Sequence, residues 1–300
     1  MPYLAAIDIG SNAMRLAIAH QTSEGLHMSF RSREAVRLGQ SVFQGGEIDP
    51  ETYEKLAGAM MKFRNQMENH NVEKFRAIAT SAMRNARNKE EIVEKLKVAT
   101  GISVEVISGD EESQLVKLAV EQKMDLSQGR FLLIDIGGGS IELIGLANGS
   151  LLKKQSFPLG TVRALQLMKK QKSHKKLRDW YPQYVRDTLK DFFQDDFPKA
   201  VGLGGNMERF AKLKSFVSED GGEWLSLHEM EGLLDLILSL NYEERISHFA
   251  LRPDRSDVIV PAALATVEIM HLAKSQVIYL PEVGIKEGIL YELSKSSKSC

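Results

Sequence analysis

The sequence predicts an α/β protein that is built twice, with one mixed sheet in each half. Two observations carry this prediction: a segment near the N-terminus repeats in the middle of the chain, and strand-like and helix-like stretches alternate after both copies. The length of 300 residues is enough for two domains, each with a core of its own. We therefore expect two related α/β domains in which helices cover the sheets.

The repeat aligns Ile7–Leu16 (IDIGSNAMRL) with Ile134–Leu143 (IDIGGGSIEL) without gaps. Each copy follows an apolar run, breaks at glycine and resumes as a second apolar run, which is the pattern of strand, tight turn and strand. Both copies place an aspartate, Asp8 or Asp135, directly before the turn, although a buried strand otherwise favours apolar residues. Two unrelated strands would not readily repeat that aspartate, so the match indicates an internal duplication.

In the first half, a turn at residues 23–25 and a third strand follow the hairpin. A helix begins at Asp49 and Pro50, because Asp is a favoured N-cap residue and Pro is favoured at the first helical position. Strands and helices then alternate. The expected elements are a strand over 75–80, a helix over 88–99 that ends at Gly101, a strand over 103–108 and a helix over 111–123.

The second half repeats this order, so each half follows the pattern βββαβαβα. A turn at residues 147–150 leads to a third strand, and one of the later helices begins with a capping box from Ser226 to Glu229. The other expected elements are helices between 161 and 193, strands over 200–203 and 276–280, and a last helix from Gly284. A polar stretch near residues 123–130 separates the halves. The predicted domains are 1–125 and 126–300, with the final helix, about 284–298, packing back on the first domain.

Charge and composition exclude several classes of protein. The chain has 39 Lys and Arg against 40 Asp and Glu, a formal net charge of −1, so no global field attracts nucleic acid or a lipid surface. Cys300 is the only cysteine, which excludes an internal disulfide and a cysteine metal site. The first residues lack the pattern of a signal peptide, and no uninterrupted apolar run approaches the ~18 residues of a membrane span. We expect a cytoplasmic protein with no nucleic-acid and no membrane partner.

The two predicted turns have the chemistry of a phosphate site. An aspartate that ends a buried strand is costly unless it is paired, hydrogen-bonded or bound to a metal, so Asp8 and Asp135 facing one cleft suggest Mg²⁺. A run of three glycines lacks Cβ atoms, so its backbone N–H groups can converge on phosphate oxygens, and short polar side chains add donors. The residues expected to contact phosphate at these turns are Ser11, Asn12, Gly137, Gly138, Gly139 and Ser140.

Other known phosphate and hydrolase motifs do not fit the sequence. It contains no Gly-Lys dipeptide, which excludes a P-loop, and no Gly-x-Ser-x-Gly elbow. The segment 202–207 has Met207 where the dinucleotide fingerprint needs its third glycine. His228-Glu229 lacks the second histidine of a zinc-protease motif.

The motifs of the chain resemble those of a known superfamily. Paired Asp-x-Gly hairpins in two βββαβαβα halves resemble the actin, sugar kinase and heat-shock chaperone superfamily. The resemblance implies a duplicated ribonuclease-H-like (actin-like ATPase) fold with an interdomain cleft. Within that superfamily the chain resembles the short, two-domain form of the exopolyphosphatase and guanosine pentaphosphate phosphohydrolase (Ppx/GppA) family. The motifs that carry this narrower resemblance are segments 8–16, 79–87, 107–113, 135–142, 159–163 and 284–288.

The resemblance implies a role for each site residue. It assigns the general base to Glu112, the Mg²⁺ ligands to Asp135, Glu142 and, through water, Asp8, and the clamping of phosphate oxygens to Arg15 and Arg84. It also implies a nucleoside or phosphate contact at a loop over 202–206, through Gly204, Gly205 and Asn206. Relatives usually have Thr or Ser in place of Asn206 and often have Arg in place of Lys286, which puts nucleotide recognition in doubt.

Plainer interpretations of the same residues stay open. Glu111 and Glu112 could simply stabilise the positive end of a helix, and Arg84 could form a surface ion pair. Glu142 could be an exposed residue of a strand. The basic run between Lys169 and Arg178 could follow a long anionic chain, although a solvated helix end is the plainer interpretation.

We predict a Mg²⁺-dependent exopolyphosphatase that releases orthophosphate from the end of inorganic polyphosphate, acting as a homodimer. The main alternative is a guanosine pentaphosphate 5′-phosphohydrolase, in which guanosine penta- or tetraphosphate would be the ligand. Two weaker alternatives are an ATP-dependent kinase or ATPase of the same fold and a non-catalytic sensor of an alarmone or polyphosphate. All four share the phosphate chemistry of the two turns.

Overall fold

The computed structural model describes residues 2–23, 25–170 and 176–296. The chain divides into two compact units: unit 1 contains residues 1–119 and 284–300, and unit 2 contains residues 120–283. The chain therefore passes from one unit to the other twice. The first crossing precedes the predicted boundary near residue 125, and the last helix belongs to the first unit.

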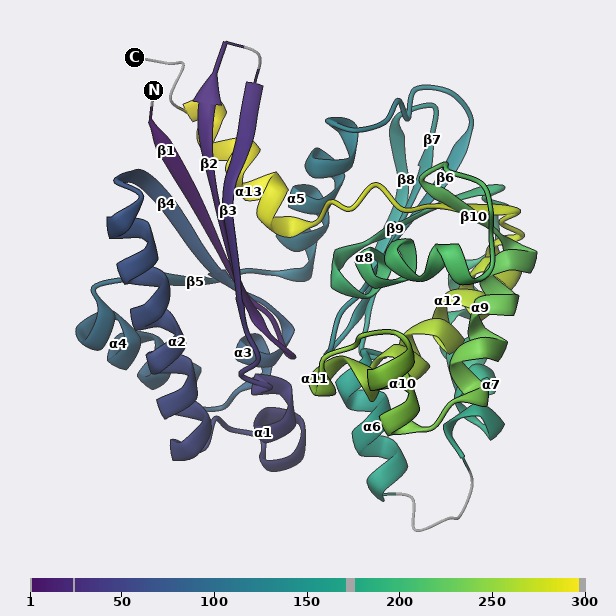
Figure 1. The fold of residues 1–300 in the computed structure, drawn as a ribbon, viewed down its shortest axis with the longest axis horizontal. Helices are drawn as coiled ribbons and strands as arrows, with labels where there is room; N and C mark the ends of the chain where they lie inside the picture. The colour runs from purple at the N-terminus through teal and green to yellow at the C-terminus, as the bar shows by residue number, and fades with distance from the viewer. Residues whose placement is uncertain (1, 24, 171–175, 297–300) are drawn as a thin grey trace. The chain divides into compact units, whose positions relative to one another are not determined.

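Unit 1 has a five-stranded sheet in the order β3-β2-β1-β4-β5 (Figure 1). Its first three strands form an antiparallel meander, and β4 and β5 are parallel to β1. The strands are β1 (Tyr3–Ile9), β2 (Met14–Thr22), β3 (Gly25–Glu34), β4 (Val72–Ala79) and β5 (Val104–Val106). Its helices are α1 (Leu38–Gly45), α2 (Pro50–Asn69), α3 (Ser81–Asn85), α4 (Lys89–Thr100), α5 (Gly109–Glu121) and α13 (Ile285–Ser296).

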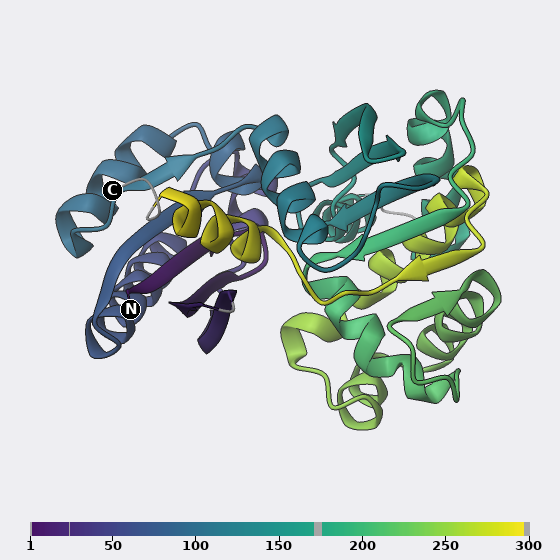
Figure 2. The same ribbon diagram turned by 90° about the horizontal axis from the view of Figure 1, so that it is seen from above.

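Helices cover both faces of this sheet. On one face, alternate residues of β1 and β2, such as Ile7 and Leu16, pack with Phe63 of α2 and Leu96 of α4 in a single apolar cluster. On the other face α13 contacts β1, β2, β3 and β4, and Figure 2 shows it alongside β1. Because side chains alternate between the faces of a strand, Asp8 points to the face that α13 covers.

Unit 2 repeats this arrangement with one strand more. Its sheet has the order β10-β11-β9-β6-β7-β8, in which β6, β7 and β8 form the antiparallel meander and β9 and β11 are parallel to β6. The extra strand β10 pairs antiparallel with β11. The strands are β6 (Arg130–Ile136), β7 (Ile141–Ala147), β8 (Ser150–Phe157), β9 (Lys199–Leu203), β10 (Trp224–Ser226) and β11 (Val277–Tyr279).

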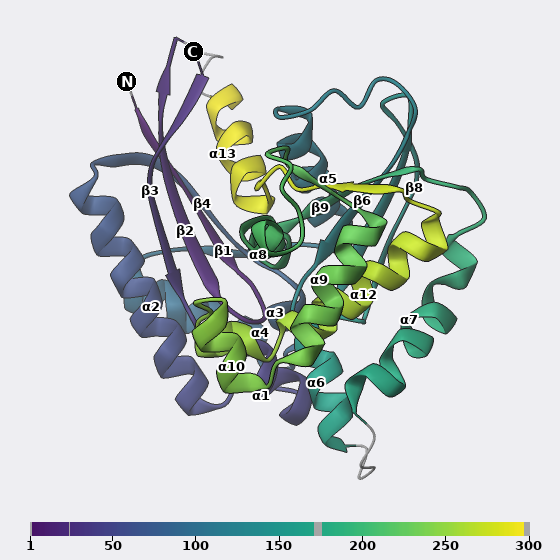
Figure 3. The ribbon, with the colours of Figure 1, turned by 45° about the vertical axis from the view of Figure 1, so that its right-hand side comes forward.

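The helices of unit 2 surround one very apolar helix, α12, which packs against α7 and α9 and lies between them in Figure 3. The segment Pro253–Ala273 is long and apolar enough to span a membrane by length and composition, but 78% of its most apolar window is buried, as expected for a core helix. The helices are α6 (Thr161–Lys170), α7 (Tyr181–Leu189), α8 (Gly204–Leu213), α9 (Leu227–Ser239), α10 (Tyr242–His248), α11 (Pro253–Ser256) and α12 (Ile259–Ala273), and the short 3₁₀ helices are η1 (Leu177–Asp179), η2 (Lys190–Phe192) and η3 (Lys214–Phe216).

Most predicted helix ends are confirmed. The Asp49 side chain accepts a hydrogen bond from the backbone N–H of Thr52, and Ser226 and Glu229 form the capping box. The helix predicted over 111–123 begins earlier, at Gly109, because the Ser108 hydroxyl accepts a hydrogen bond from the backbone N–H of Glu111.

The prediction of a loop over 202–206 is wrong. Strand β9 continues to Leu203, and α8 begins at the next residue. Gly204 has a φ of 76°, a left-handed conformation that suits glycine and turns the chain from strand to helix without intervening residues. The predicted fold class itself is confirmed: the chain is an α/β protein in which one ribonuclease-H-like meander and its parallel strands occur twice.

Candidate functional site

In unit 1 the turn between β1 and β2 is held by the start of α1. Gly10 donates its backbone N–H to the carbonyl of Ala13 at 3.2 Å, which closes the turn. The carbonyl of Ser11 accepts from the N–H of Gly39 at 2.7 Å, and the next carbonyl accepts from the N–H of Arg37 at 3.0 Å. The turn is therefore fixed by backbone hydrogen bonds from a helix that comes after the third strand of the meander.

Asp8 and Arg15 lie directly opposite each other in the register of β1 and β2. The Nη1 atom of Arg15 is 3.2 Å from Oδ2 of Asp8, which is 5% exposed. A buried carboxylate needs such a partner, because an unpaired charge away from water is costly. Two of the residues predicted for this turn, Asp8 and Arg15, thus occur together as an ion pair beside the turn.

In unit 2 the corresponding turn is supported in the same way by α6. The carbonyl of Gly137 accepts from the N–H of Thr161 at 3.0 Å, and the carbonyl of Gly138 accepts from the N–H of Val162 at 2.8 Å. The packing is tight, because a Cβ atom at Gly160 would lie 2.3 Å from the backbone carbon of Gly138. Arg163 adds a side-chain hydrogen bond, from Nε to the carbonyl of Gly139 at 2.7 Å.

This support directs the carbonyls of the glycine turn toward α6. Within the part of the chain that the structure describes, the backbone N–H groups of Gly138 and Gly139 have no hydrogen-bond acceptor. Burial lowers the pKa of the Arg163 guanidinium, although Arg163 stays a strong donor because its ordinary pKa is so high. The turn therefore combines fixed carbonyls with backbone donors that an anion can use.

Asp135 and Glu142 lie directly opposite each other in the register of β6 and β7. Glu142 is 2% exposed and its Oε1 accepts a hydrogen bond from the Ser156 hydroxyl at 2.9 Å, so it is not an exposed strand residue. Asp135 lies against the start of α8, since a Cβ atom at Gly204 would be 2.6 Å from its Oδ1. Two carboxylates at opposed positions repel each other, and a bound cation removes that repulsion.

The donor set of unit 2 fits a magnesium ion that also binds substrate. Mg²⁺ typically binds one or two protein carboxylates and completes its shell with water and phosphate oxygens. Asp135 and Glu142 supply two carboxylates beside the glycine turn. Among the described residues, no group of three His, Cys, Asp or Glu side chains forms a candidate metal site.

Asn206 is used inside unit 2. Its Nδ2 donates to the carbonyl of Ile136 at 2.7 Å, and its Oδ1 accepts from Nη1 of Arg255 at 3.3 Å. Asn206 therefore ties the end of β6 to the first turn of α8, next to Gly204 and Gly205. Arg255 is 8% exposed and lies in the short helix α11; no local motif marks it, so it could not be predicted from the sequence.

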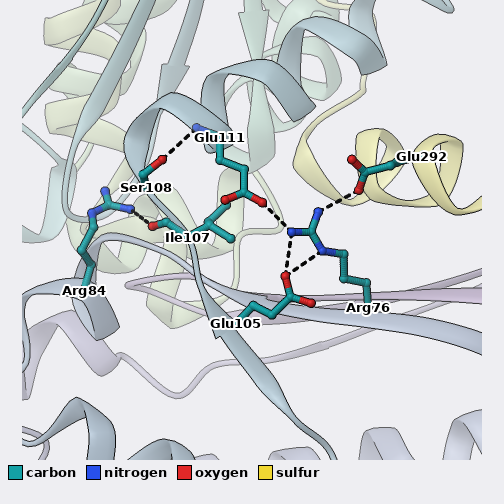
Figure 4. Close-up of polar contacts among 7 residues, drawn as sticks. All are labelled: Arg76, Arg84, Glu105, Ile107, Ser108, Glu111 and Glu292. Carbon is teal, nitrogen blue, oxygen red and sulfur yellow. Dashed lines mark hydrogen bonds and ion pairs between the residues drawn. The ribbon is translucent and has the colours of Figure 1, made fainter.

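Glu112 and Arg84 come together in unit 1. Glu112 is in the first turn of α5 and is 8% exposed. Nη1 of Arg84 donates to the carbonyl of Ile107 at 2.7 Å and lies 3.4 Å from Oε2 of Glu112 (Figure 4 shows the first contact). Arg84 is therefore anchored to the backbone and faces a buried carboxylate, which excludes an ordinary surface ion pair.

The neighbouring Glu111 has a different environment. Its carboxylate accepts a hydrogen bond from Nη2 of Arg76 at 2.5 Å (Figure 4). The side chain of Glu111 is 40% exposed, against 10% for that of Glu112. The same arginine also binds Glu105 and Glu292. Glu111 therefore belongs to a cluster of charged side chains around Arg76, whereas the adjacent Glu112 is buried beside Arg84.

Two further predictions concern lysines. Residues 171–175 of the basic run, with Lys172 and Lys175, lie outside the described residues, so its role as a track for a long anion stays a prediction. Lys169, Lys176 and Arg178, at its two ends, are exposed. Lys286 is 7% exposed, with Nζ 3.2 Å from Oε1 of Glu287.

Each unit holds groups that suit transfer of a phosphoryl group. Unit 2 offers backbone donors for phosphate oxygens beside a pair of carboxylates suited to Mg²⁺. Unit 1 offers a buried carboxylate, Glu112, and the guanidinium groups of Arg84 and Arg15. A carboxylate that orients water and arginines that neutralise phosphate oxygens are the parts that hydrolysis of a phosphoanhydride requires.

Comparison with known proteins gives a consistent result. A family model described as the Ppx/GppA phosphatase family matches residues 17–297. Exopolyphosphatase 1 of Mycobacterium tuberculosis is 25% identical over 299 residues, which cover 96% of this chain and 87% of that protein. A bifunctional 3-dehydroquinate synthase/phosphatase of Fusobacterium nucleatum is 27% identical over 310 residues, which cover 96% of this chain and 46% of that protein.

Solved structures are similar over the whole chain. The crystal structure of an exopolyphosphatase from Cytophaga hutchinsonii has a TM-score of 0.89 at 26% identity and covers 98% of both chains. The structure of a Ppx/GppA protein from Aquifex aeolicus has a TM-score of 0.82 at 23% identity, with 100% of this chain and 99% of that chain covered. The second likeness supports the duplicated actin-like fold alone.

Proposed function

Because the chain belongs to the Ppx/GppA phosphatase family, we propose that it is a Mg²⁺-dependent exopolyphosphatase that releases orthophosphate from the end of inorganic polyphosphate. The observation that carries the proposal is the turn of unit 2, where backbone donors at Gly138 and Gly139 lie beside the opposed carboxylates of Asp135 and Glu142. The names of the relatives from M. tuberculosis and C. hutchinsonii support the choice of substrate.

The terminal phosphoryl group binds to the glycine turn through its negatively charged oxygens. The N–H groups of Gly138 and Gly139, with the Ser140 hydroxyl, donate to these oxygens, and the backbone needs no rearrangement because α6 already holds the carbonyls. Asp135 and Glu142 would hold Mg²⁺, with Asp8 contributing through water. A metal held there would supply positive charge that neutralises the phosphate oxygens of the substrate.

Glu112 orients the attacking water and takes its proton. The water oxygen forms a bond to the terminal phosphorus, the bond from that phosphorus to the bridging oxygen breaks, and the shortened polyphosphate leaves with the electron pair. Arg84 is assigned to the phosphate oxygens, with its position set by the Ile107 carbonyl. Arg15 is assigned the same role beside the turn of unit 1.

The substrate assignment favours polyphosphate over guanosine pentaphosphate. A nucleotide needs groups that recognise its base, and the residue assigned to that contact, Asn206, uses both ends of its amide within unit 2. Polyphosphate needs only repeated contacts to charge, which arginines and backbone donors supply.

Release of orthophosphate from polyphosphate, guanosine pentaphosphate and ATP, each with and without Mg²⁺, tests the proposal. The expected result is Mg²⁺-dependent release that is fastest from polyphosphate. Faster release from guanosine pentaphosphate would transfer the assignment to the alternative phosphohydrolase. Release from ATP alone would favour an ATPase, and binding of polyphosphate without release would favour a sensor.

A further inference from the structure

Arg76 forms ion pairs with three carboxylates, as Figure 4 shows. Its Nη2 donates to Glu105 at 2.7 Å and to Glu111 at 2.5 Å, and its Nη1 donates to Glu292 at 2.8 Å. We refer to Arg76, Glu105, Glu111 and Glu292 as the Arg76 cluster. It joins four elements of unit 1, namely β4, β5, α5 and α13.

The helices α5 and α13 also pack closely against each other. A Cβ atom at Gly288 of α13 would lie 2.0 Å from the carbonyl oxygen of Leu115 of α5, so only glycine permits this approach. The side chain of Arg76 is 15% exposed. Glu105 accepts hydrogen bonds from the Arg76 guanidinium, which raises the pKa of Arg76 above its ordinary value. The cation in the cluster is therefore permanent at any physiological pH.

We propose that Arg76 is a positioning residue for hydrolysis: by binding Glu111 it fixes the first turn of α5, and so holds the adjacent Glu112 beside Arg84. The proposal rests on the assignment of Glu112 as general base. Residues at successive positions of a first helical turn share one backbone, so a shift of Glu111 also moves Glu112. The backbone of the same turn is separately anchored at Ser108, whose hydroxyl accepts from the N–H of Glu111 at 3.1 Å and whose carbonyl accepts from the N–H of Glu112 at 3.0 Å, so Arg76 supplies the side-chain anchor of Glu111.

Removal of Arg76 does more than break one contact. It takes away the guanidinium that Glu105, Glu111 and Glu292 share, so the like charges of Glu105 and Glu111 repel each other and push Glu111 away from β5. Small displacements of a group that orients water are costly for the rate, while substrate binding through the turns is unaffected. The proposal therefore requires a loss in kcat with little change in KM.

The first experiment compares Arg76→Gln, Arg76→Lys and a control, Arg64→Gln, in the full-length protein. Arg64 also binds a glutamate, Glu68, and a backbone carbonyl, that of Thr100, but on α2. We expect kcat on polyphosphate with Mg²⁺ to fall about 10-fold in Arg76→Gln and about 3-fold in Arg76→Lys, with KM within about 2-fold, as for other groups that orient a reacting one. Arg64→Gln should leave kcat unchanged. Equal losses in Arg76→Gln and Arg64→Gln would overturn the proposal.

A double-mutant cycle separates positioning from a general structural effect. In a Glu112→Gln background there is no base to position, so Arg76→Gln should lower the residual rate by less than about 2-fold. A further 10-fold loss in that background would show that Arg76 acts without Glu112, and would overturn the proposal. Thermal unfolding of each variant accompanies the kinetics.

Glu111 variants keep the test valid if Arg76→Gln does not fold. Glu111→Gln retains an oxygen that accepts from Arg76 and should keep more than half of the wild-type kcat. Glu111→Ala breaks the link from Arg76 to α5 but leaves Arg76 bound to Glu105 and Glu292, and should lower kcat about 3- to 10-fold. Full activity in Glu111→Ala would overturn the proposal. If the wild type releases no orthophosphate from polyphosphate, the proposed function fails instead, so the two failures are distinguishable.

Discussion

The two turns are copies of one backbone design that carry different charges. In unit 1 the N–H of Gly39 binds the carbonyl of Ser11, and in unit 2 the N–H of Val162 binds the carbonyl of the aligned residue Gly138. The two units differ in the residues that face each other across the two strands beside the turn. Asp8 of β1 faces Arg15 of β2, whereas the aligned Asp135 of β6 faces Glu142 of β7. With Arg15 the pair consists of opposite charges that neutralise each other. With Glu142 in the aligned position the pair consists of two negative charges, which favours a bound cation.

This comparison assigns separate tasks to the two units. Unit 1 provides arginines and the proposed base, and unit 2 provides the proposed metal site and the backbone donors. The turn tolerates the exchange of Arg15 for Glu142, because the hydrogen bonds that the two turns share are made by main-chain groups and not by these two side chains. The following predictions test the division of tasks, beginning with the largest effect.

Glu112→Gln should lower kcat about 10² to 10⁴-fold, the usual range for loss of a general base, with substrate still bound. The substitution keeps the size of the side chain and removes its ability to take a proton. Initial rates of orthophosphate release over a range of polyphosphate concentrations give kcat and KM separately. More than a third of wild-type turnover in this variant would mean that unit 1 does not supply the base at this position.

Asp135→Asn and Glu142→Gln should each lower activity on the order of 10²-fold at a fixed Mg²⁺ concentration, since a metal contributes several kcal/mol to stabilising the transition state. Higher Mg²⁺ should restore part of the loss. Asp8→Asn provides the matched change in unit 1, and should cost only about 10-fold, because Asp8 already binds Arg15.

Chelation with EDTA should abolish wild-type activity, and added Mg²⁺ should restore it. If Asp8→Asn needs as much extra Mg²⁺ as Asp135→Asn, the two turns contribute equally to the metal, and the proposed difference between them is wrong.

Gly160→Ala should lower both stability and activity more than Gly39→Ala. The added methyl at Gly160 meets the backbone of the glycine turn at 2.3 Å, so the turn itself must move. At Gly39 the closest atom, at 2.7 Å, belongs to the ring of Phe43, which can shift, and the Cβ atom of Ser11 lies further away, at 3.0 Å. We expect Gly160→Ala to cost about 1–3 kcal/mol of unfolding free energy, as overpacking does.

The activity of Gly160→Ala should fall about 10-fold, because the donors at Gly138 and Gly139 no longer converge on one point. Urea unfolding and initial rates measure the two effects. A loss of stability with unchanged kcat/KM would show that the glycine turn does not contact substrate.

The parts of the fold that follow local rules could be predicted from the sequence. The hairpins, the Asp49 cap and the Ser226 capping box each depend on neighbouring residues, and each was predicted. The start of α8 was not, because a pair of glycines is equally compatible with a loop, and the contact of Gly204 with Asp135, 69 positions earlier in the chain, is not visible in any local pattern.

The candidate site was less predictable, because its contacts join distant residues. The hydrogen bond from Asn206 to Ile136 spans 70 positions, and the one from Arg76 to Glu292 spans 216. No local pattern distinguishes Glu111 from Glu112, which are adjacent and identical. The structure distinguishes them because Arg76 lies beside one and Arg84 beside the other.

The smallest expected effect concerns the charge of unit 1. Polyphosphate binds counterions as any polyelectrolyte does, so kcat/KM should fall as salt rises, with a slope that reflects the number of cationic contacts. If Arg15 is one of these contacts, Arg15→Gln should raise KM for polyphosphate about 3-fold. It should also reduce the slope of log(kcat/KM) against log[salt] by about 0.7, by analogy with single-stranded nucleic acid.

Because this variant leaves Asp8 without its arginine, Asp8→Asn/Arg15→Gln is the matched control: it removes both charges and should show the same reduced slope. An unchanged slope in both variants would mean that Arg15 makes no ionic contact with the substrate and serves only to neutralise Asp8.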